Sequence, residues 1–141
     1  MATVRTATTH WEGSLFEGSG RVTPQSSGMS PFDVTWAARA EDPGGRTSPE
    51  ELIAEAHSAC FSMFLSNVLA QAGNPPQALD TTADVTFQPG EGITGIKLTV
   101  RGTVPGMSED QFREAAENAK ENCPVSQALK ATPITLEASL A

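Results

Sequence analysis

One long predicted helix over residues 48–73, which contains the apolar run from Leu52 to Leu69, constrains the fold of this chain more than any other part of it. Ser48, Pro49 and Glu51 are typical of a helix start with a capping box, because serine caps free N–H groups and proline fits the first helical position. Gly73, followed by Asn-Pro-Pro, is typical of a helix end. Apolar residues occupy almost every face in between, so we expect a helix buried on most sides. A small domain rarely encloses a helix so fully, which predicts a second layer or a partner subunit.

The segments on either side of this stretch contain β patterns. Residues 3–40 mix apolar residues with glycine and threonine, and 34–39 is predicted to be a strand that ends in Arg39. Alternating apolar and polar residues predict half-buried strands at 83–87 and 96–101, and a last strand along 134–140.

A second helical region follows these two inner strands. Ser108 and Gln111 form a second capping-box pattern, which predicts a helix from Ser108 onward. Cys123-Pro124 ends that helix, and a short helix is expected over 125–130. Strands first, then a long helix, two strands, a helix pair and a strand predict an α+β fold.

Length and charge narrow the class of protein. A chain of 141 residues predicts one domain over residues 1–141. The net charge of −8 and pI of about 4.6 disfavour nucleic acid and anionic membranes as partners. The first five residues have no apolar signal-peptide core, and no uninterrupted apolar run is long enough for a membrane span. We therefore expect a cytoplasmic protein.

Neither a nucleotide nor a metal site is expected. Residues 90–95 match the pattern G-x-G-x-x-G, but a strand follows them where the dinucleotide-binding fold needs a helix, so they predict a hairpin turn. The candidate metal ligands His10, His57, Cys60 and Cys123 lack paired ligand spacing. There is also no G-x-S-x-G elbow for a serine hydrolase. No cofactor is predicted.

Cys60 is one of only two cysteines, and it lies in the middle of the long apolar helix. Free cysteine often packs as a small hydrophobe, so a structural role is one interpretation. The other is a reactive thiol with helical neighbours at Ala56, His57, Met63 and Phe64. His57 would either lower the pKa of the thiol or simply pack, and the other neighbours would form an apolar pocket.

Cys123 stands directly before Pro124, near the N-cap of the predicted short helix. Free N–H groups and the helix dipole at such a position favour a thiolate. The alternative is a linker cysteine with no role. In a reducing compartment a pair such as Cys60 and Cys123 is more often transient and catalytic than a structural disulfide. The two cysteines therefore suggest a redox pair.

Five strings in the chain carry a family resemblance that spans nearly all of it. They are residues 48–53, 56–62 around Cys60, 122–131 around Cys123, and the shorter 10–13 and 80–85. Together they resemble the OsmC/Ohr family of thiol-dependent peroxidases. The Ohr branch has an arginine in its N-terminal glycine turn, where this chain has Glu17-Gly18. Arg39 stands instead at the position of the OsmC-branch arginine, which favours that branch.

The resemblance implies a two-cysteine mechanism and its partners. Cys60 would be the peroxidatic thiolate, and Cys123 would resolve its sulfenic acid as an intramolecular disulfide. Arg39 would stabilise the thiolate and orient the peroxide, and Glu50 would hold Arg39 in place. The substrate would be an organic hydroperoxide, with hydrogen peroxide reduced less well, and an external dithiol would be the reductant.

Helix geometry adds a prediction about assembly. Glu50 and Cys60 are ten residues apart on one helix, which is roughly 15 Å along its axis. If both serve one site, Glu50 must come from a partner subunit, which predicts an intertwined homodimer with two composite sites. The resemblance implies antiparallel sheets around the central, largely apolar helices of that dimer. Three alternatives remain: a non-enzymatic redox sensor, a carrier of apolar ligands, and a dimeric stress protein with a structural disulfide.

Overall fold

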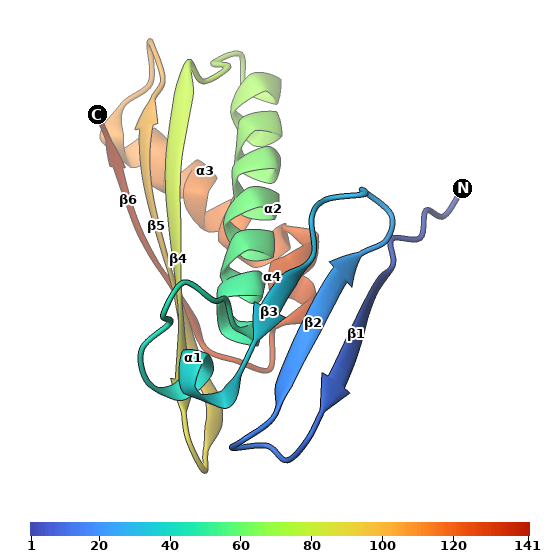
Figure 1. The fold of residues 1–141 in the computed structure, drawn as a ribbon. Coiled ribbons are helices and arrows are strands. Elements are labelled where there is room, and N and C mark those ends of the chain that lie inside the picture. Colours follow the sequence, from blue (N-terminus) through green and yellow to red (C-terminus); the bar gives the residue numbers. More distant parts are fainter. The chain divides into compact units, whose positions relative to one another are not determined.

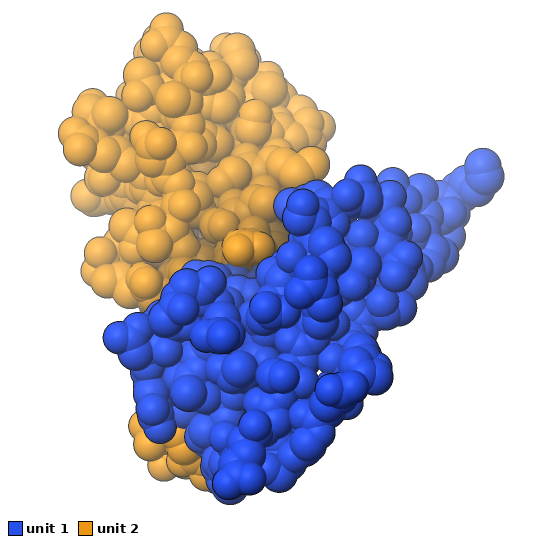
Figure 2. All heavy atoms as spheres, in the orientation of Figure 1, with its two compact units in different colours: residues 1–52 blue, residues 53–141 orange.

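The computed structural model describes all residues, 1–141, and divides the chain into two compact units. Residues 1–52 form unit 1 and residues 53–141 form unit 2 (Figure 2). The long helix begins in unit 1 and continues through unit 2. Helices and strands occur together in the order predicted for an α+β fold (Figure 1). The prediction of one domain over residues 1–141 stays a prediction.

Unit 1 contains a small antiparallel sheet, as the N-terminal pattern predicted. Its strands are β1 (Ala7–Glu12), β2 (Ser19–Pro24) and β3 (Phe32–Val34), in that order. Trp11 on β1 lies opposite Gly20 on β2, and a side chain at Gly20 would come within 2.7 Å of the Trp11 ring. The glycine therefore makes room for the indole to lie over the sheet.

The prediction of a strand over residues 34–39 is wrong, because this segment turns into a short helix, α1 (Trp36–Ala40). The Thr35 side chain accepts a hydrogen bond of 3.1 Å from the backbone N–H of Ala38, which makes Thr35 an N-cap. The alanines that follow are strong helix formers. Arg39 consequently lies in the last turn of a helix.

Helix α2 (Pro49–Gln71) has the ends that the sequence predicted. At its start the backbone N–H of Glu51 donates to the Ser48 hydroxyl over 3.1 Å, while the Glu51 carboxylate accepts from the Thr47 hydroxyl. At its end Gly73 has a φ of 87°, and the N–H of Asn74 donates to the Leu69 carbonyl. This is the Schellman arrangement that glycine permits.

The chain covers only one stripe of α2. His57, Phe61, Leu65 and Leu69 recur every four residues and are completely buried. Met63 on another face is 74% exposed. By length and composition alone α2 could cross a membrane, but the core helix of a soluble protein meets the same criterion. The prediction that α2 is buried on most sides therefore depends on a second body outside this chain, and it stays a prediction.

Unit 2 is built on a second three-stranded sheet in the order β4, β5, β6: β4 (Ala78–Gln88), β5 (Gly92–Thr103) and β6 (Ile134–Leu140). Strands β4 and β5 form the predicted antiparallel hairpin, and Gly90 and Gly92 turn it with positive φ angles. No helix follows this glycine motif, as expected for a turn.

Strand β6 corrects the expectation of purely antiparallel sheets, because it pairs parallel to β5. The chain returns from the end of β5 through α3 (Glu109–Asn122) and α4 (Pro124–Ala128), and parallel neighbours require such a crossover. The predicted capping box of Ser108 and Gln111 is present in full at the start of α3.

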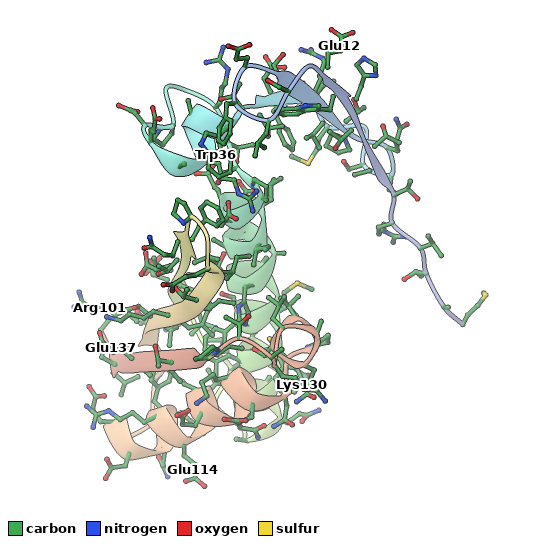
Figure 3. The ribbon with its side chains drawn as sticks, turned by 90° about the horizontal axis from the view of Figure 1, so that it is seen from below. Glu12, Trp36, Arg101, Glu114, Lys130 and Glu137 are labelled. Carbon is green, nitrogen blue, oxygen red and sulfur yellow. The ribbon has the colours of Figure 1, made fainter.

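Helices α2 and α3 cover one face of this sheet (Figure 1). Leu98 and Val100 of β5 are buried against Phe61 of α2 and Phe112 of α3. The exposed Arg101 and Glu137 lie on the opposite face of the sheet (Figure 3). The two-residue alternation of a strand thus places the core of unit 2 between the sheet and the two helices.

Candidate active site

The structure brings the two cysteines together within unit 2. Cys60 projects from the middle of α2 and is half-buried, whereas Cys123 is completely buried at the N-cap of α4; both are free thiols. The two thiols are neighbours: Cys123 and the backbone N–H of Val125, both at the start of α4, each influence the pKa of the Cys60 thiol. The fold therefore places two cysteines that are distant in the sequence beside each other.

The surroundings within unit 2 keep Cys60 protonated. Burial raises the pKa of the Cys60 thiol most strongly, the N–H of Val125 lowers it, and the neighbouring Cys123 raises it again. A reactive thiolate at this position therefore requires a cation in addition to these groups.

His57 does not supply that cation. Burial lowers the pKa of the His57 imidazole, so the ring is neutral at pH 7. Its Nε2 atom lies 2.7 Å from the Ser126 hydroxyl oxygen, not against the Cys60 sulfur. Of the two roles that the sequence left open, lowering the pKa of Cys60 is thus not favoured by the geometry.

Ser126 is a site residue to which sequence reasoning assigned no role. The Cys123 thiol donates to the Ser126 hydroxyl over 3.1 Å, and the backbone N–H of Ser126 donates to the Cys123 sulfur over 3.4 Å. Ser126 is three residues beyond the N-cap, where the backbone N–H characteristically bonds the capping side chain. The placement of Cys123 directly before Pro124 was the signal that could have identified it.

Arg39 and Glu50 form a close ion pair within unit 1. The guanidinium donates from Nε and Nη2 to Glu50 Oε1 over 3.0 and 2.8 Å, and from Nε to Oε2 over 3.2 Å. Glu50 is 6% exposed, whereas the Arg39 side chain is 30% exposed. Charge-assisted bonds of this kind hold a guanidinium in one orientation.

An apolar cavity of about 80 Å³ adjoins Arg39 in unit 1. Its walls are Trp11, Leu15, Val34, Thr35, Trp36 and Pro49. The ring of Phe16 packs edge-on against Trp36, with 5.3 Å between centroids. The apolar pocket that the sequence predicted around Cys60 is not closed by the chain itself, because Ala56 and Met63 are exposed.

Metal ligands do not gather anywhere in the chain. No group of three or more His, Cys, Asp or Glu side chains is placed so that it could hold a metal ion. His10 is paired with Glu12 on the surface of unit 1, far along the sequence from the two thiols.

Burial of neutral His57 predicts a pH dependence of stability. Because its pKa is lowered from 6.5 in the fold, the contribution is complete above that pH and is lost as the pH falls toward the folded pKa. We expect the free energy of unfolding, measured with urea, to decrease below about pH 6.5 and His57→Gln to remove part of that slope. His10→Gln, at a site with a 78% exposed side chain, is the matched control. Parallel pH profiles for His57→Gln and the wild type would contradict this prediction.

This chain is similar in sequence to proteins of a known family. The family model described as "OsmC-like protein" matches residues 42–138. Peroxiredoxin OsmC of Escherichia coli is 44% identical over 134 residues, which cover 93% of this chain and 92% of that protein.

Solved structures share the fold. The first, from Legionella pneumophila, is described as an organic hydroperoxide resistance protein OsmC; it has a TM-score of 0.77 at 23% identity and covers 99% of this chain and 98% of its own. The organic hydroperoxide resistance protein OhrB of Bacillus subtilis has a TM-score of 0.67 at 22% identity, covering 96% of this chain and 98% of its own. At these identities the structures establish the fold alone.

Proposed function

This chain belongs to the OsmC-like protein family, and we propose that it is a cytoplasmic thiol-dependent peroxidase that reduces organic hydroperoxides. The observation that carries the proposal is that Cys60 and Cys123 are neighbours within unit 2, close enough that Cys123 raises the pKa of the Cys60 thiol. Two neighbouring free thiols, one half-exposed and one buried, suit a pair in which the first meets the oxidant and the second closes a disulfide.

The reaction proceeds in three steps. The Cys60 thiolate attacks the outer oxygen of the hydroperoxide: an S–O bond forms, the O–O bond breaks, and the alcohol leaves with a proton. The Cys123 sulfur then attacks the Cys60 sulfenic acid: an S–S bond forms, the S–O bond breaks, and the hydroxide leaves as water after taking a proton. An external dithiol finally reduces the disulfide and is itself oxidised.

Arg39 supplies the cation that the Cys60 thiolate requires. Its guanidinium stabilises the thiolate and orients the peroxide oxygens, while Glu50 fixes its direction through the ion pair. Since Glu50 is ten residues before Cys60 on α2, roughly 15 Å along the axis, the Arg39–Glu50 pair that serves one Cys60 comes from the partner subunit. The protein is accordingly a homodimer with two composite sites.

The exposed apolar residues of α2 supply a surface for this dimer. Met63, Ala56 and Ala59 are exposed in the single chain although they lie on the most apolar helix. A partner that covers them would bury the faces left open by the sheet of unit 2. The apolar cavity beside Arg39 would then receive the carbon chain of the substrate, which explains a preference for organic hydroperoxides.

The proposal is tested by steady-state consumption of a series of peroxides with a dithiol reductant. We propose that kcat/KM for alkyl and aryl hydroperoxides exceeds that for hydrogen peroxide by about tenfold or more, since apolar contacts in the cavity lower the transition-state energy. A redox sensor would form the disulfide stoichiometrically but would not turn over. A carrier of apolar ligands would bind them without consuming peroxide. Either result would overturn the enzyme assignment.

Substitution of the resolving thiol separates the first two steps. In Cys123→Ser we expect Cys60 to be oxidised at the wild-type rate, but the sulfenic acid accumulates and dithiol-dependent turnover falls by roughly tenfold or more, because an intramolecular attack is lost. Trapping with a sulfenic-acid reagent and intact-protein mass spectrometry measure both species. The control is Ser62→Ala on α2, which removes a hydroxyl that is hydrogen-bonded to Thr81 of β4. Unchanged turnover in Cys123→Ser would exclude Cys123 as the resolving residue.

A further inference from the structure

His57 is a buried titratable side chain that the peroxidase cycle described above leaves without a role. It is completely buried on the same α2 stripe as Phe61, and its Nε2 lies 2.7 Å from Ser126 Oγ. The Cys123 thiol donates to that same oxygen over 3.1 Å. One hydroxyl therefore links the buried imidazole to the buried thiol.

The direction of the hydrogen bonds follows from counting protons. A serine hydroxyl has a single proton, and when its oxygen accepts from the Cys123 thiol, that proton is free to be donated to His57 Nε2. His57 then carries its own proton on Nδ1. A donor chain therefore runs from Cys123 through Ser126 to the imidazole.

The other ring nitrogen argues against simple packing. His57 Nδ1 is buried without a hydrogen-bond partner, a condition that destabilises the folded protein. An apolar side chain at the same place would avoid that cost. A neutral imidazole that is held at the end of a donor chain has, by contrast, one basic nitrogen aimed at the thiol system.

We propose that Ser126 and His57 form a proton relay for the resolving step, in which Ser126 receives the Cys123 proton and passes its own to His57 Nε2. The inference rests on the proposed function, since it assigns a base to the attack of Cys123 on the Cys60 sulfenic acid. Ser126 contacts a reacting atom and is a catalytic residue in this step, whereas His57 acts through it and is a positioning residue.

The protons and electrons of the relay balance over the cycle. As the S–S bond forms and the S–O bond of the sulfenic acid breaks, the Cys123 proton moves to Ser126 and the Ser126 proton moves to His57. The hydroxide that leaves half-exposed Cys60 takes a proton from solvent and becomes water. The external dithiol then supplies two electrons and two protons. The imidazolium returns its proton through Ser126 to the released Cys123 thiolate, and Cys60 is released as the thiolate. The two dithiol protons replace the two taken from solvent, one by the leaving alkoxide and one by the leaving hydroxide.

The burial of His57 is consistent with this role. Burial lowers the pKa of its imidazole, so the ring is in the basic form at neutral pH and gives up an acquired proton readily. The same burial weakens it as a base. The expected acceleration is therefore at the low end of general base catalysis, about 10–100-fold.

The test measures oxidation and resolution separately in single turnovers of the full-length protein. Reduced protein is mixed with one equivalent of an organic hydroperoxide, quenched at intervals and analysed for sulfenic acid and disulfide. His57→Gln retains an amide that can bond Ser126 but takes up no proton; Ser126→Ala removes the relay and Ser126→Thr restores the hydroxyl. We expect disulfide formation to slow by about 10–100-fold in His57→Gln and Ser126→Ala, with Cys60 oxidation within about twofold of wild type and Ser126→Thr largely rescued.

The outcomes separate the relay from the proposed function. If the wild type forms disulfide and His57→Gln resolves equally fast, the relay fails and the peroxidase assignment stands. If His57→Gln slows oxidation and resolution alike, its role is structural and the relay fails. If the wild type forms no disulfide at all, the proposed function fails and the relay with it. A solvent deuterium isotope effect on wild-type disulfide formation supports the relay even if a variant does not fold, and its absence overturns it.

Discussion

Cys60→Ser is expected to abolish peroxide turnover, with kcat/KM reduced by at least roughly a thousandfold, because a serine hydroxyl does not ionise to a nucleophile at neutral pH. The sulfur is the atom that would accept oxygen from the peroxide, and no other thiol is exposed enough to replace it, since Cys123 is completely buried. Peroxide consumption with excess dithiol measures the loss.

The design of this experiment guards against indirect effects. Cys60 is half-buried on α2, and serine is close to it in size, so the variant should unfold at nearly the wild-type urea concentration. Ser62→Ala on the same helix should keep full activity, because Ser62 bonds Ser58 and Thr81 and neither cysteine. Turnover retained in a folded Cys60→Ser protein would contradict the whole mechanism.

Arg39→Met is expected to lower kcat/KM by about 10²–10³-fold, because it removes the only cation that the mechanism assigns to the Cys60 thiolate and the peroxide. The kcat/KM of Arg39→Lys should lie between those of the wild type and Arg39→Met, because lysine keeps the charge but loses the planar fork that pairs with Glu50. The pH dependence of Cys60 alkylation measures the thiol directly. In Arg39→Met the apparent pKa of that thiol should rise above its wild-type value.

Mixing two inactive proteins tests whether the site is composite. In a heterodimer of Cys60→Ser and Arg39→Met, one site combines an intact Cys60 with an intact Arg39 from the other chain. Unfolding and refolding an equal mixture should therefore restore about one quarter of wild-type activity, because half of the dimers are mixed and each has one complete site. Light scattering confirms the dimer. No recovery in a mixture that does form heterodimers would place Arg39 and Cys60 of one site on the same chain.

Stability must be separated from catalysis in the Arg39 variants. Arg39→Met leaves the buried Glu50 carboxylate unpaired, which we estimate to cost about 2–3 kcal/mol in the free energy of unfolding. A second change, Glu50→Gln, removes the unpaired charge and should recover much of that loss. Activity should stay low in the double variant, because the cation is still missing. Recovery of both properties together would mean that Arg39 acts only through folding.

Helix ends were predictable from the sequence because capping is local. Ser48, Gly73 and Ser108 each bond a backbone group within five residues, and each stands where the sequence placed it. Residues 34–39 were mispredicted for a related reason: valine, threonine and tryptophan favour strands, but Thr35 also caps a helix, and in the fold this cap and the alanines prevail.

Other features depend on contacts between distant segments. The direction of β6 follows from the crossover through α3 and α4, and periodicity within β6 is the same for either direction. Ser126 acquires its place because α4 packs against α2 and brings His57 to its hydroxyl. The spacing of residues along the chain does not predict this contact between His57 and Ser126.

The sequence by itself determined the family of this chain, its α+β class, the ends of its main helices and the identity of its two thiols. These features are predictable because motifs and helix caps depend on residues that are close together in the sequence. Only the tertiary structure decided that Cys60 neighbours Cys123, that Glu50 holds Arg39 in an ion pair, and that His57 faces Ser126 and not Cys60. The physical reason is that hydrogen bonds and pKa shifts depend on distance and burial in three dimensions, and packing of the core of unit 2 sets both around the thiols.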